Sequence, residues 1–385
     1  MPDGGTSRVL HVAQPTTEGV ARCVVDLVRH QAAQGWDVTV ACPPDGDLPA
    51  QASAAGAEVL SWPASRAPGP TVPSEAVRLG RLIRTVDPDL VHLHSAKAGL
   101  AGRLALRGRV PTVYQPHAWS FLAVRGLVRR ASLQWERRAL RWTDRVVCVS
   151  RAECEDGLRA GLRLEGRTVV VPNGVDTERF TPGDREAARA RLGVGPGPLA
   201  VCVGRLSRQK GQDVLLEAWP DVRDAVAGVT LALVGDGPDR EELSGRAPED
   251  VRFVGRADPL DWYVAADVVV LPSRWEGMAL VPLEAAACGR SVVVTDVAGA
   301  RETIPDDAGS AVVPPEDVTA LAAALVPRLA NREAADREGE RARQHVLRQH
   351  DVRRTTGSVL DVYRDVLGAR SRRRASRTGG RGSAG

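Results

Sequence analysis

The sequence has few cysteines, only two lysines and few aromatic residues. Its cysteines form no C-x-x-C pair, which argues against the common zinc and redox motifs and against a disulfide framework. Several lie within apolar strand or helix patterns, where cysteine behaves as a small hydrophobic residue. We therefore expect reduced core thiols at Cys23, Cys42, Cys148, Cys154, Cys202 and Cys288.

Long apolar runs are also missing. The chain contains no run of about 18 uncharged apolar residues, and residues 1–7 have no apolar core of signal-peptide length. We expect a cytoplasmic protein without a membrane span. At 385 residues, with 43% apolar and 26% charged residues, the chain suits two globular domains.

The excess of positive charge belongs to one end of the chain. Residues 369–385 hold six arginines and no acid, and without them 46 basic and 48 acidic residues give a net charge of −2. A nearly neutral body argues against nucleic acid as a partner. The Gly, Ser and Arg composition predicts a disordered tail, which is either a solvated terminus or a contact for anionic lipid or polyphosphate.

Short β-branched apolar runs alternate with amphipathic helical patterns along the first half. This alternation is typical of β-α-β units around a buried parallel sheet. The helical patterns include residues 20–34 and 73–86. The predicted strands are residues 8–13, 37–41, 90–94, 110–115, 145–150 and 168–171.

The same pattern begins again after a Pro- and Gly-rich stretch near residues 171–183. It predicts an α/β protein with two Rossmann-like, doubly wound domains, residues 1–178 and 179–348. Ligands of such sheets bind beyond the carboxyl ends of the strands, so we expect the two domains to share one crevice. The second set of strands comprises residues 199–204, 230–235, 251–255, 268–272 and 291–295.

Two cations follow the first strand of the second domain. Residues 201–219 are expected to form a strand, a turn and a helix, which places Arg205 and Lys210 at the carboxyl end of the strand. Fixed cations there would stabilise the negative charge that a departing diphosphate gains. A solvated basic turn is the alternative. The other lysine, Lys97, is expected at a solvated helix start or facing an anionic acceptor.

Two carboxylates occupy residues 275–289. Pro282 suits the first turn of a helix, so Glu284 is expected near the helix start, where a carboxylate is stabilised and can accept hydrogen bonds from both ribose hydroxyls. The alternative is that Glu284 only complements the helix dipole and binds no ligand. Glu276 lies in the preceding loop, within reach of sugar hydroxyls. Phosphate oxygens would meet the main-chain amides of Gly277, Met278 and Ala279.

These two segments resemble the donor site of family 4 of the nucleotide-sugar glycosyltransferases. The resemblance implies a GT-B fold of two facing domains, with Arg205 and Lys210 on the diphosphate, Glu284 on the ribose and Glu276 on the donor sugar. It also implies retaining transfer with no cofactor and no metal. Further similarity covers residues 171–176, 233–238, 253–255, 265–277 and 297–302.

The resemblance extends to the first domain and to the end of the chain. Gly19, in the loop after the first strand, would let backbone approach phosphate. His117 would contact the donor sugar, with a structural histidine as the alternative. His92 and His94 share one face of a strand and could be two metal ligands, but no third ligand pattern accompanies them. By analogy, a helix at 349–368 crosses back onto the first domain.

The implied activity is that of a hexosyltransferase. The donor would be a UDP- or GDP-linked sugar and the acceptor a saccharide or a polyprenyl-linked sugar, in assembly of surface polysaccharide or glycolipid. A nucleotide-sugar isomerase and a noncatalytic nucleotide-sugar-binding protein are the alternatives. Residues 119–145 combine seven arginines with three tryptophans. They predict either peripheral contact with anionic lipid at the inner face of the cell membrane or a docked helix with a basic outer face.

Overall fold

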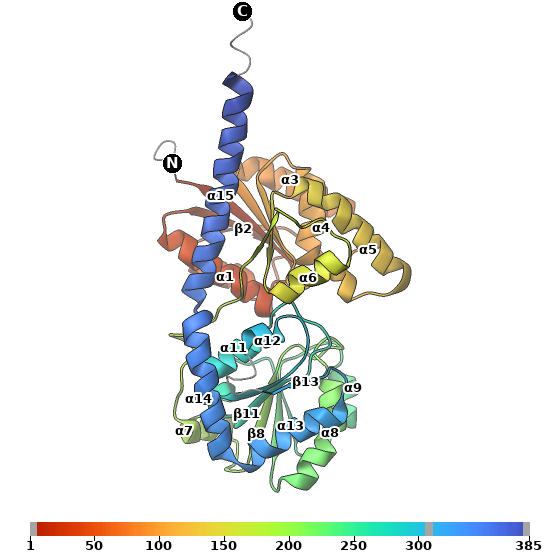
Figure 1. The fold of residues 1–385 in the computed structure, drawn as a ribbon, viewed down its shortest axis with the longest axis vertical. Coiled ribbons are helices and arrows are strands. Elements are labelled where there is room, and N and C mark those ends of the chain that lie inside the picture. The colour runs from red at the N-terminus through yellow and green to blue at the C-terminus, as the bar shows by residue number, and fades with distance from the viewer. Residues whose placement is uncertain (1–5, 305–310, 380–385) are drawn as a thin grey trace, which may run out of the picture. The chain divides into compact units, whose positions relative to one another are not determined.

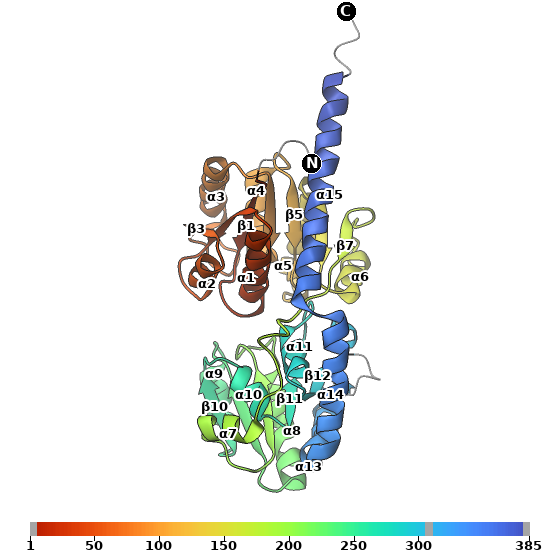
Figure 2. The ribbon, with the colours of Figure 1, turned by 90° about the vertical axis from the view of Figure 1, so that its left-hand side faces the viewer.

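The structure is a computed structural model that describes residues 6–304 and 311–379. The chain forms two compact units, which are described separately (Figures 1 and 2). The first unit runs to Pro172 and takes up the chain again from Arg353, and the second is Asn173–Val352. All six cysteines lie in the described part of the chain as free thiols.

The first unit is built on a seven-stranded parallel sheet in the order β3-β2-β1-β4-β5-β6-β7. Its strands are β1 (Arg8–Ala13), β2 (Asp37–Cys42), β3 (Glu58–Ser61), β4 (Leu90–His94), β5 (Thr112–Gln115), β6 (Arg145–Cys148) and β7 (Thr168–Val170). Its helices are α1 (Glu18–Ala33), α2 (Leu48–Ala54), α3 (Val72–Val86), α4 (Ser95–Leu106), α5 (Gly126–Ala139), α6 (Arg151–Arg159) and α15 (Val352–Gly379).

Helices cover both faces of this sheet. Val9 of β1 belongs to the core shared with α1, α2 and α15, whereas the next residue, Leu10, belongs to the core shared with α3 and α4. Successive side chains of a strand point to opposite faces, so both faces of β1 are buried. This double burial explains the continuous apolar runs of the sequence.

The second unit holds a six-stranded parallel sheet in the order β10-β9-β8-β11-β12-β13. Its strands are β8 (Leu199–Val203), β9 (Thr230–Val234), β10 (Val251–Gly255), β11 (Val268–Leu271), β12 (Ser291–Thr295) and β13 (Ala311–Val313). Its helices are α7 (Arg185–Leu192), α8 (Gln212–Ala225), α9 (Arg240–Arg246), α10 (Leu260–Ala265), α11 (Leu280–Ala287), α12 (Ala300–Thr303), α13 (Val318–Ala330) and α14 (Arg332–Gln349).

The strand order reverses beside the first strand of each sheet. In the first unit β1 lies between β2 and β4, and in the second β8 lies between β9 and β11. The connections that leave two such neighbouring strands turn to opposite faces, which opens a ligand crevice at their carboxyl ends. The predicted pair of doubly wound parallel sheets is confirmed.

Helix α15 belongs to the first unit and runs along its sheet (Figure 2). It packs there through Val359, Leu360, Val362, Tyr363 and Val366. The helix continues to Gly379, beyond the predicted end at 368, so the first part of the predicted disordered tail, residues 369–379, is helical, and residues 380–385 lie outside the described residues.

The beginning of that tail is also anchored. The guanidinium of Arg370 bonds to the carboxylate of Asp144 at 2.9 Å and to the carbonyl oxygen of Gly108 at 3.0 Å. Arg370 therefore has a structural partner rather than only solvent. Among the helices described, none combines the length and the apolar character that crossing a bilayer requires.

Candidate active site

The turn after β8 brings Lys210 back against the end of its own strand. Gly204 has φ +154°, and a Cβ built on it would lie 3.6 to 3.7 Å from methylene carbons of Lys210. The side-chain amide of Gln212 donates to the carbonyl oxygen of Arg205 at 3.0 Å, which fixes the first part of the turn. Arg205 itself is half-buried at the strand end.

Lys210 and Glu276, predicted from separate segments, form an ion pair. Lys210 Nζ lies 2.6 Å from Glu276 Oε1, and Ser273 Oγ donates to the same oxygen at 2.7 Å. The two side chains are only 16% and 10% exposed, so solvent screens the pair weakly. This pair joins the carboxyl ends of β8 and β11, on either side of the strand-order reversal.

Glu284 is the fifth residue of α11 and is almost fully buried. The hydroxyl of Tyr263, which is itself buried, donates to Glu284 Oε2 at 2.7 Å. Pro282 lies in the first turn, as predicted, but Glu284 lies in the middle of this eight-residue helix, and the bond to Tyr263 fixes its carboxylate there. Ala279 is the N-cap residue, and its side chain forms no cap hydrogen bond.

The loop of Gly277, Met278 and Ala279 is held between two other segments. The side-chain amide of Asn173 donates to the carbonyl oxygen of Met278 at 2.8 Å. On another side, a Cβ added to Gly299 would lie 2.6 Å from the carbonyl oxygen of Gly277, so only glycine fits there. That the amides of this loop bind phosphate stays a prediction.

The loops after β8 and β11 are tied together through their main chains. Arg274 N donates to Gln209 O at 2.8 Å, and the Gln209 side chain donates to Trp275 O at 3.0 Å. Gly211 has φ +69°, and a Cβ added to it would lie 2.0 Å from the carbonyl oxygen of Pro272. The backbone contacts therefore hold the loop of Lys210 against the loop of Glu276. Sequence reasoning missed the contributions of Tyr263, Ser273 and Gln209.

His117 lies in the first unit, in a short segment after β5 with unusual backbone geometry. His117 and Ala118 have φ +53° and +84°, which is costly for residues other than glycine. The buried carboxylate of Glu153 accepts hydrogen bonds from Ala118 N at 2.6 Å and from Val149 N at 2.7 Å. Burial raises the pKa of Glu153 to about 7 in spite of these donors. Glu153, which the sequence did not indicate, holds the segment that carries His117.

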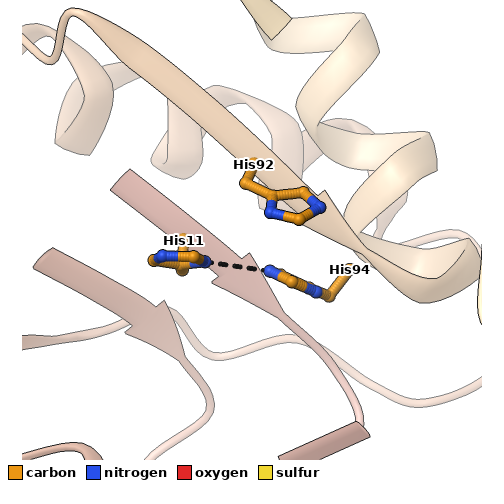
Figure 3. Close-up of side chains that lie close together, drawn as sticks. All are labelled: His11, His92 and His94. Atoms are coloured by element: carbon orange, nitrogen blue, oxygen red, sulfur yellow. Dashed lines mark hydrogen bonds between the residues drawn. The ribbon is translucent and has the colours of Figure 1, made fainter. Parts of the chain in front are cut away.

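Three buried histidines, His11, His92 and His94, lie together (Figure 3). His94 of this group contacts His117. Burial lowers the pKa of His11 to about 4 and holds the pKa values of His92 and His94 well below the ordinary value, so these imidazoles are neutral.

One ring nitrogen from each of these three histidines lies within 4.8 Å of the other two, which is close enough to suggest a metal site. Two imidazoles on a tetrahedral zinc have ring centres roughly 5 Å apart. His11 and His94 fit at 5.2 Å, but the ring centres of His92 and His94 lie too close together, at 3.9 Å. The described rings do not fit a three-histidine metal site.

Of the two remaining positions considered in the first unit, Gly19 lies on the surface and Lys97 lies in the core. Gly19 is exposed and is the second residue of α1, so it lies in the helix and not in the loop where the sequence placed it. Lys97 is buried and pairs with Glu75 at 2.8 Å, so both expectations for it, a solvated helix start and an anionic acceptor, were wrong.

The arginine- and tryptophan-rich segment, residues 119–145, also has a buried part and an exposed part. Trp119 and Phe121 are each 1% exposed and pack in the core, so they cannot contact a membrane in this structure. Glu136 of α5 forms a buried ion pair with Arg103 at 2.8 Å, which docks this helix on the unit. The start of α5 nevertheless exposes Leu127 at 79% and Val128 at 62%. Helix α5 is therefore anchored by a buried ion pair, whereas its first residues present apolar side chains to solvent.

Two family models cover most of the chain. The model described as Glycosyltransferase Family 4 matches residues 17–179, and the one described as Glycosyl transferases group 1 matches residues 197–331. A D-inositol 3-phosphate glycosyltransferase of Saccharomonospora viridis is 33% identical over 73% of this chain and 71% of that enzyme. A GDP-mannose-dependent alpha-(1-6)-phosphatidylinositol monomannoside mannosyltransferase of Mycobacterium tuberculosis is 34% identical over 83% of this chain and 86% of that enzyme.

Solved structures share the fold at lower identity. Sucrose-phosphate synthase from Thermosynechococcus elongatus gives a TM-score of 0.81 at 24% identity and covers 94% of this chain and 100% of that one. HepE from Anabaena, in complex with UDP and glucose, gives 0.80 at 22% identity and covers 92% of this chain and 98% of that one.

Proposed function

The chain belongs to family 4 of the glycosyltransferases, and on that premise we propose that it transfers a hexose from a UDP- or GDP-linked donor to a saccharide or lipid-linked acceptor with retention of configuration. It is a hexosyltransferase that uses a nucleotide-sugar donor, and nothing supports the isomerase alternative. The retention, the residue roles and the acceptor class are our proposals.

In the proposed reaction, the bond between the anomeric carbon and the phosphate oxygen breaks while the acceptor oxygen bonds to the same face of that carbon. The acceptor hydroxyl gives its proton to the departing phosphate oxygen, so no protein base is needed. Arg205 and Lys210 stabilise the charge that accumulates on the diphosphate. Glu276 positions the sugar and Glu284 binds the ribose hydroxyls.

The observation that best supports this assignment is the ion pair between Lys210 and Glu276 at the reversal of strand order. A transition-state stabiliser is most effective when it is already oriented, because no reorganisation is then required during the reaction. Glu276 and Ser273 supply that orientation for Lys210. Tyr263 does the same for Glu284.

The test is release of nucleotide diphosphate by purified protein given GDP- or UDP-hexose with and without a candidate acceptor. We expect release that depends on the acceptor, a product with the anomeric configuration of the donor, and release about 100-fold slower in Lys210→Ala. Interconversion of the free nucleotide sugar without acceptor would contradict the proposed transfer. An inverted product would contradict retention alone.

We further propose that the acceptor is part of a glycolipid and that the start of α5 contacts the membrane. Relatives of this chain include an enzyme named for a phosphatidylinositol mannoside. Leu127 and Val128 are exposed next to the exposed Arg125, Arg129 and Arg130. Apolar side chains flanked by arginines suit insertion among anionic headgroups.

Liposome flotation tests the membrane contact. Wild-type protein is expected to float with vesicles that contain phosphatidylinositol or phosphatidylserine. The double variant Leu127→Asp, Val128→Asp should stay in the soluble fraction. Val77→Asp removes another exposed apolar side chain, which is 55% exposed on α3, and serves as the control. Equal flotation of all three proteins would contradict contact through α5.

A further inference from the structure

A continuous chain of hydrogen bonds runs from helix α1 through the histidine cluster to His117. Gln31 Oε1 lies 2.8 Å from His11 Nε2, and His11 Nδ1 lies 2.9 Å from His94 Nε2, the link drawn in Figure 3. His94 Nδ1 lies 3.2 Å from His117 Nε2. Gln31, His11 and His94 are fully buried, so water does not compete for the two bonds that join them, whereas His117 at the end is half-buried.

The carbonyl oxygen at one end fixes the direction of every bond in this chain. A neutral imidazole has one N–H donor and one acceptor nitrogen. Because Gln31 Oε1 only accepts, His11 carries its proton on Nε2 and accepts at Nδ1. His94 must then donate from Nε2 and accept at Nδ1. His117 consequently donates from Nε2 and keeps the lone pair on Nδ1.

Tyr363 of helix α15 supports the orientation of the Gln31 amide. Gln31 Nε2 donates to the hydroxyl oxygen of Tyr363 at 3.5 Å, and that hydroxyl lies 2.5 Å from His92 Nδ1. The hydroxyl accepts from the amide and donates to the imidazole. Turning the amide over would reverse the proton position on each ring as far as His117. The orientation of one buried amide therefore decides which nitrogen His117 presents.

We propose that Gln31 and Tyr363 are positioning residues that set the tautomer of His117, so that its Nδ1 accepts a hydrogen bond from a hydroxyl of the bound sugar. The part that concerns the sugar rests on the proposed function. The part that concerns the tautomer rests only on the buried hydrogen bonds of the first unit. His117 would thus select a hydroxyl donor at that point and disfavour a ligand that offers only an acceptor.

Nitrogen NMR of protein labelled with ¹⁵N-histidine tests the tautomer directly, because protonated and unprotonated imidazole nitrogens resonate in separate ranges. The chain has only seven histidines, so single substitutions can assign the signals. We expect Nε2 of His117 to be protonated and Nδ1 not, in protein without substrate. The opposite tautomer, or a mixture in the wild type, would overturn the proposal.

The variants Gln31→Met and Tyr363→Phe test what sets the tautomer. Both should give His117 as a mixture of tautomers and lower kcat/KM by roughly threefold to tenfold, the scale of one hydrogen bond. Gln34→Met makes the same replacement at the exposed end of α1 and should change neither. Tyr363→Phe removes only a hydroxyl, so it remains informative if Gln31→Met fails to fold.

The outcomes separate this inference from the proposed function. An unchanged His117 spectrum in folded Gln31→Met or Tyr363→Phe would overturn the role of Gln31 and Tyr363, whatever the activity of the enzyme. One equivalent of metal in purified protein, with metal-bound histidine signals, would also overturn it. A protein that shows the expected spectra but transfers no sugar would refute the proposed function and leave the tautomer assignment standing.

Discussion

Lys210 and Glu276 hold each other in place at the proposed donor site. Their ion pair is short and largely shielded from solvent, and Ser273 adds a second hydrogen bond to the same carboxylate oxygen. An ammonium group that is already aimed loses little entropy when the diphosphate arrives. At the scale of single residues, the site is therefore a small network of coupled charges rather than independent side chains.

Removing any one of three charged side chains should reduce activity strongly. We expect Arg205→Ala and Lys210→Ala each to lower kcat by about 100-fold, the scale for loss of one transition-state stabiliser. Glu284→Ala removes the proposed ribose contact and should lower kcat/KM strongly. Steady-state kinetics over a range of donor concentrations measure both effects. Arg208→Ala removes an exposed cation from the same turn and is the control. Near-normal rates in all three variants would refute the site.

At the scale of elements, the loops after β8 and β11 act as one piece. Gly211 approaches the carbonyl oxygen of Pro272 so closely that a methyl group cannot fit, and two hydrogen bonds from Gln209 and Arg274 span the same junction. Lys210 and Glu276 keep their spacing because the main chains of the two loops that carry them are in contact.

Gly211→Ala should disturb this junction more than backbone strain alone explains. Gly193 also has positive φ, +62°, but a Cβ there meets nothing within 4 Å. Gly193→Ala is therefore a matched control that adds strain without a clash. We expect a loss of about 1 kcal/mol for Gly193→Ala, and a clearly larger loss together with reduced kcat/KM for Gly211→Ala. Urea unfolding measures the stability of each variant and steady-state kinetics its kcat/KM. Equal effects of the two substitutions would contradict a tight contact between Gly211 and Pro272.

Most elements were predictable because each buried strand is a compact apolar run. The predicted ranges 8–13, 90–94, 251–255 and 291–295 coincide with β1, β4, β10 and β12. The strands β3 and β13 were missed. In β3 only Val59 and Leu60 are apolar, and β13 is a three-residue run ended by Pro314, so neither produces a sustained apolar pattern.

At the scale of the whole molecule, the buried neutral histidines make folding sensitive to acid. The pKa of His11 is lowered to about 4 by burial, so between pH 6.5 and 4 the unfolded chain binds a proton that the folded chain does not. Its contribution to stability is complete above about pH 6.5 and is lost as the pH falls toward 4. Glu153 has the opposite effect on stability. Burial raises its pKa from 4.5 to about 7, so between these pH values the folded chain binds a proton that the unfolded chain does not.

We expect the free energy of unfolding to be lower at pH 5 than at pH 7. His11 alone should contribute on the order of 2 kcal/mol, and burial also lowers the pKa values of His92, His94 and His117. Urea titrations at the two pH values measure the difference. His11→Gln should reduce it. Equal or greater stability at pH 5 would contradict the burial of neutral imidazoles.

The charge of the leaving diphosphate is assigned to protein cations, so activity should not require a divalent ion. Transfer rates measured with excess EDTA are expected to remain within about twofold of rates without it, because Arg205 and Lys210 supply the stabilisation that a metal would otherwise give. Complete loss of activity on chelation, restored by added Mg²⁺ or Mn²⁺, would contradict this mechanism.

The sequence by itself determined the fold class and indicated the segments of the proposed site, because both are local properties of the chain. A buried strand is an apolar run, and a charged residue just after it lies at the ligand-binding edge of the sheet. The tertiary structure alone decided which side chains meet. Lys210 finds Glu276, Tyr263 finds Glu284, and Gln31 finds Tyr363 from 332 positions away. These contacts depend on strand order and register, which apolar periodicity does not encode.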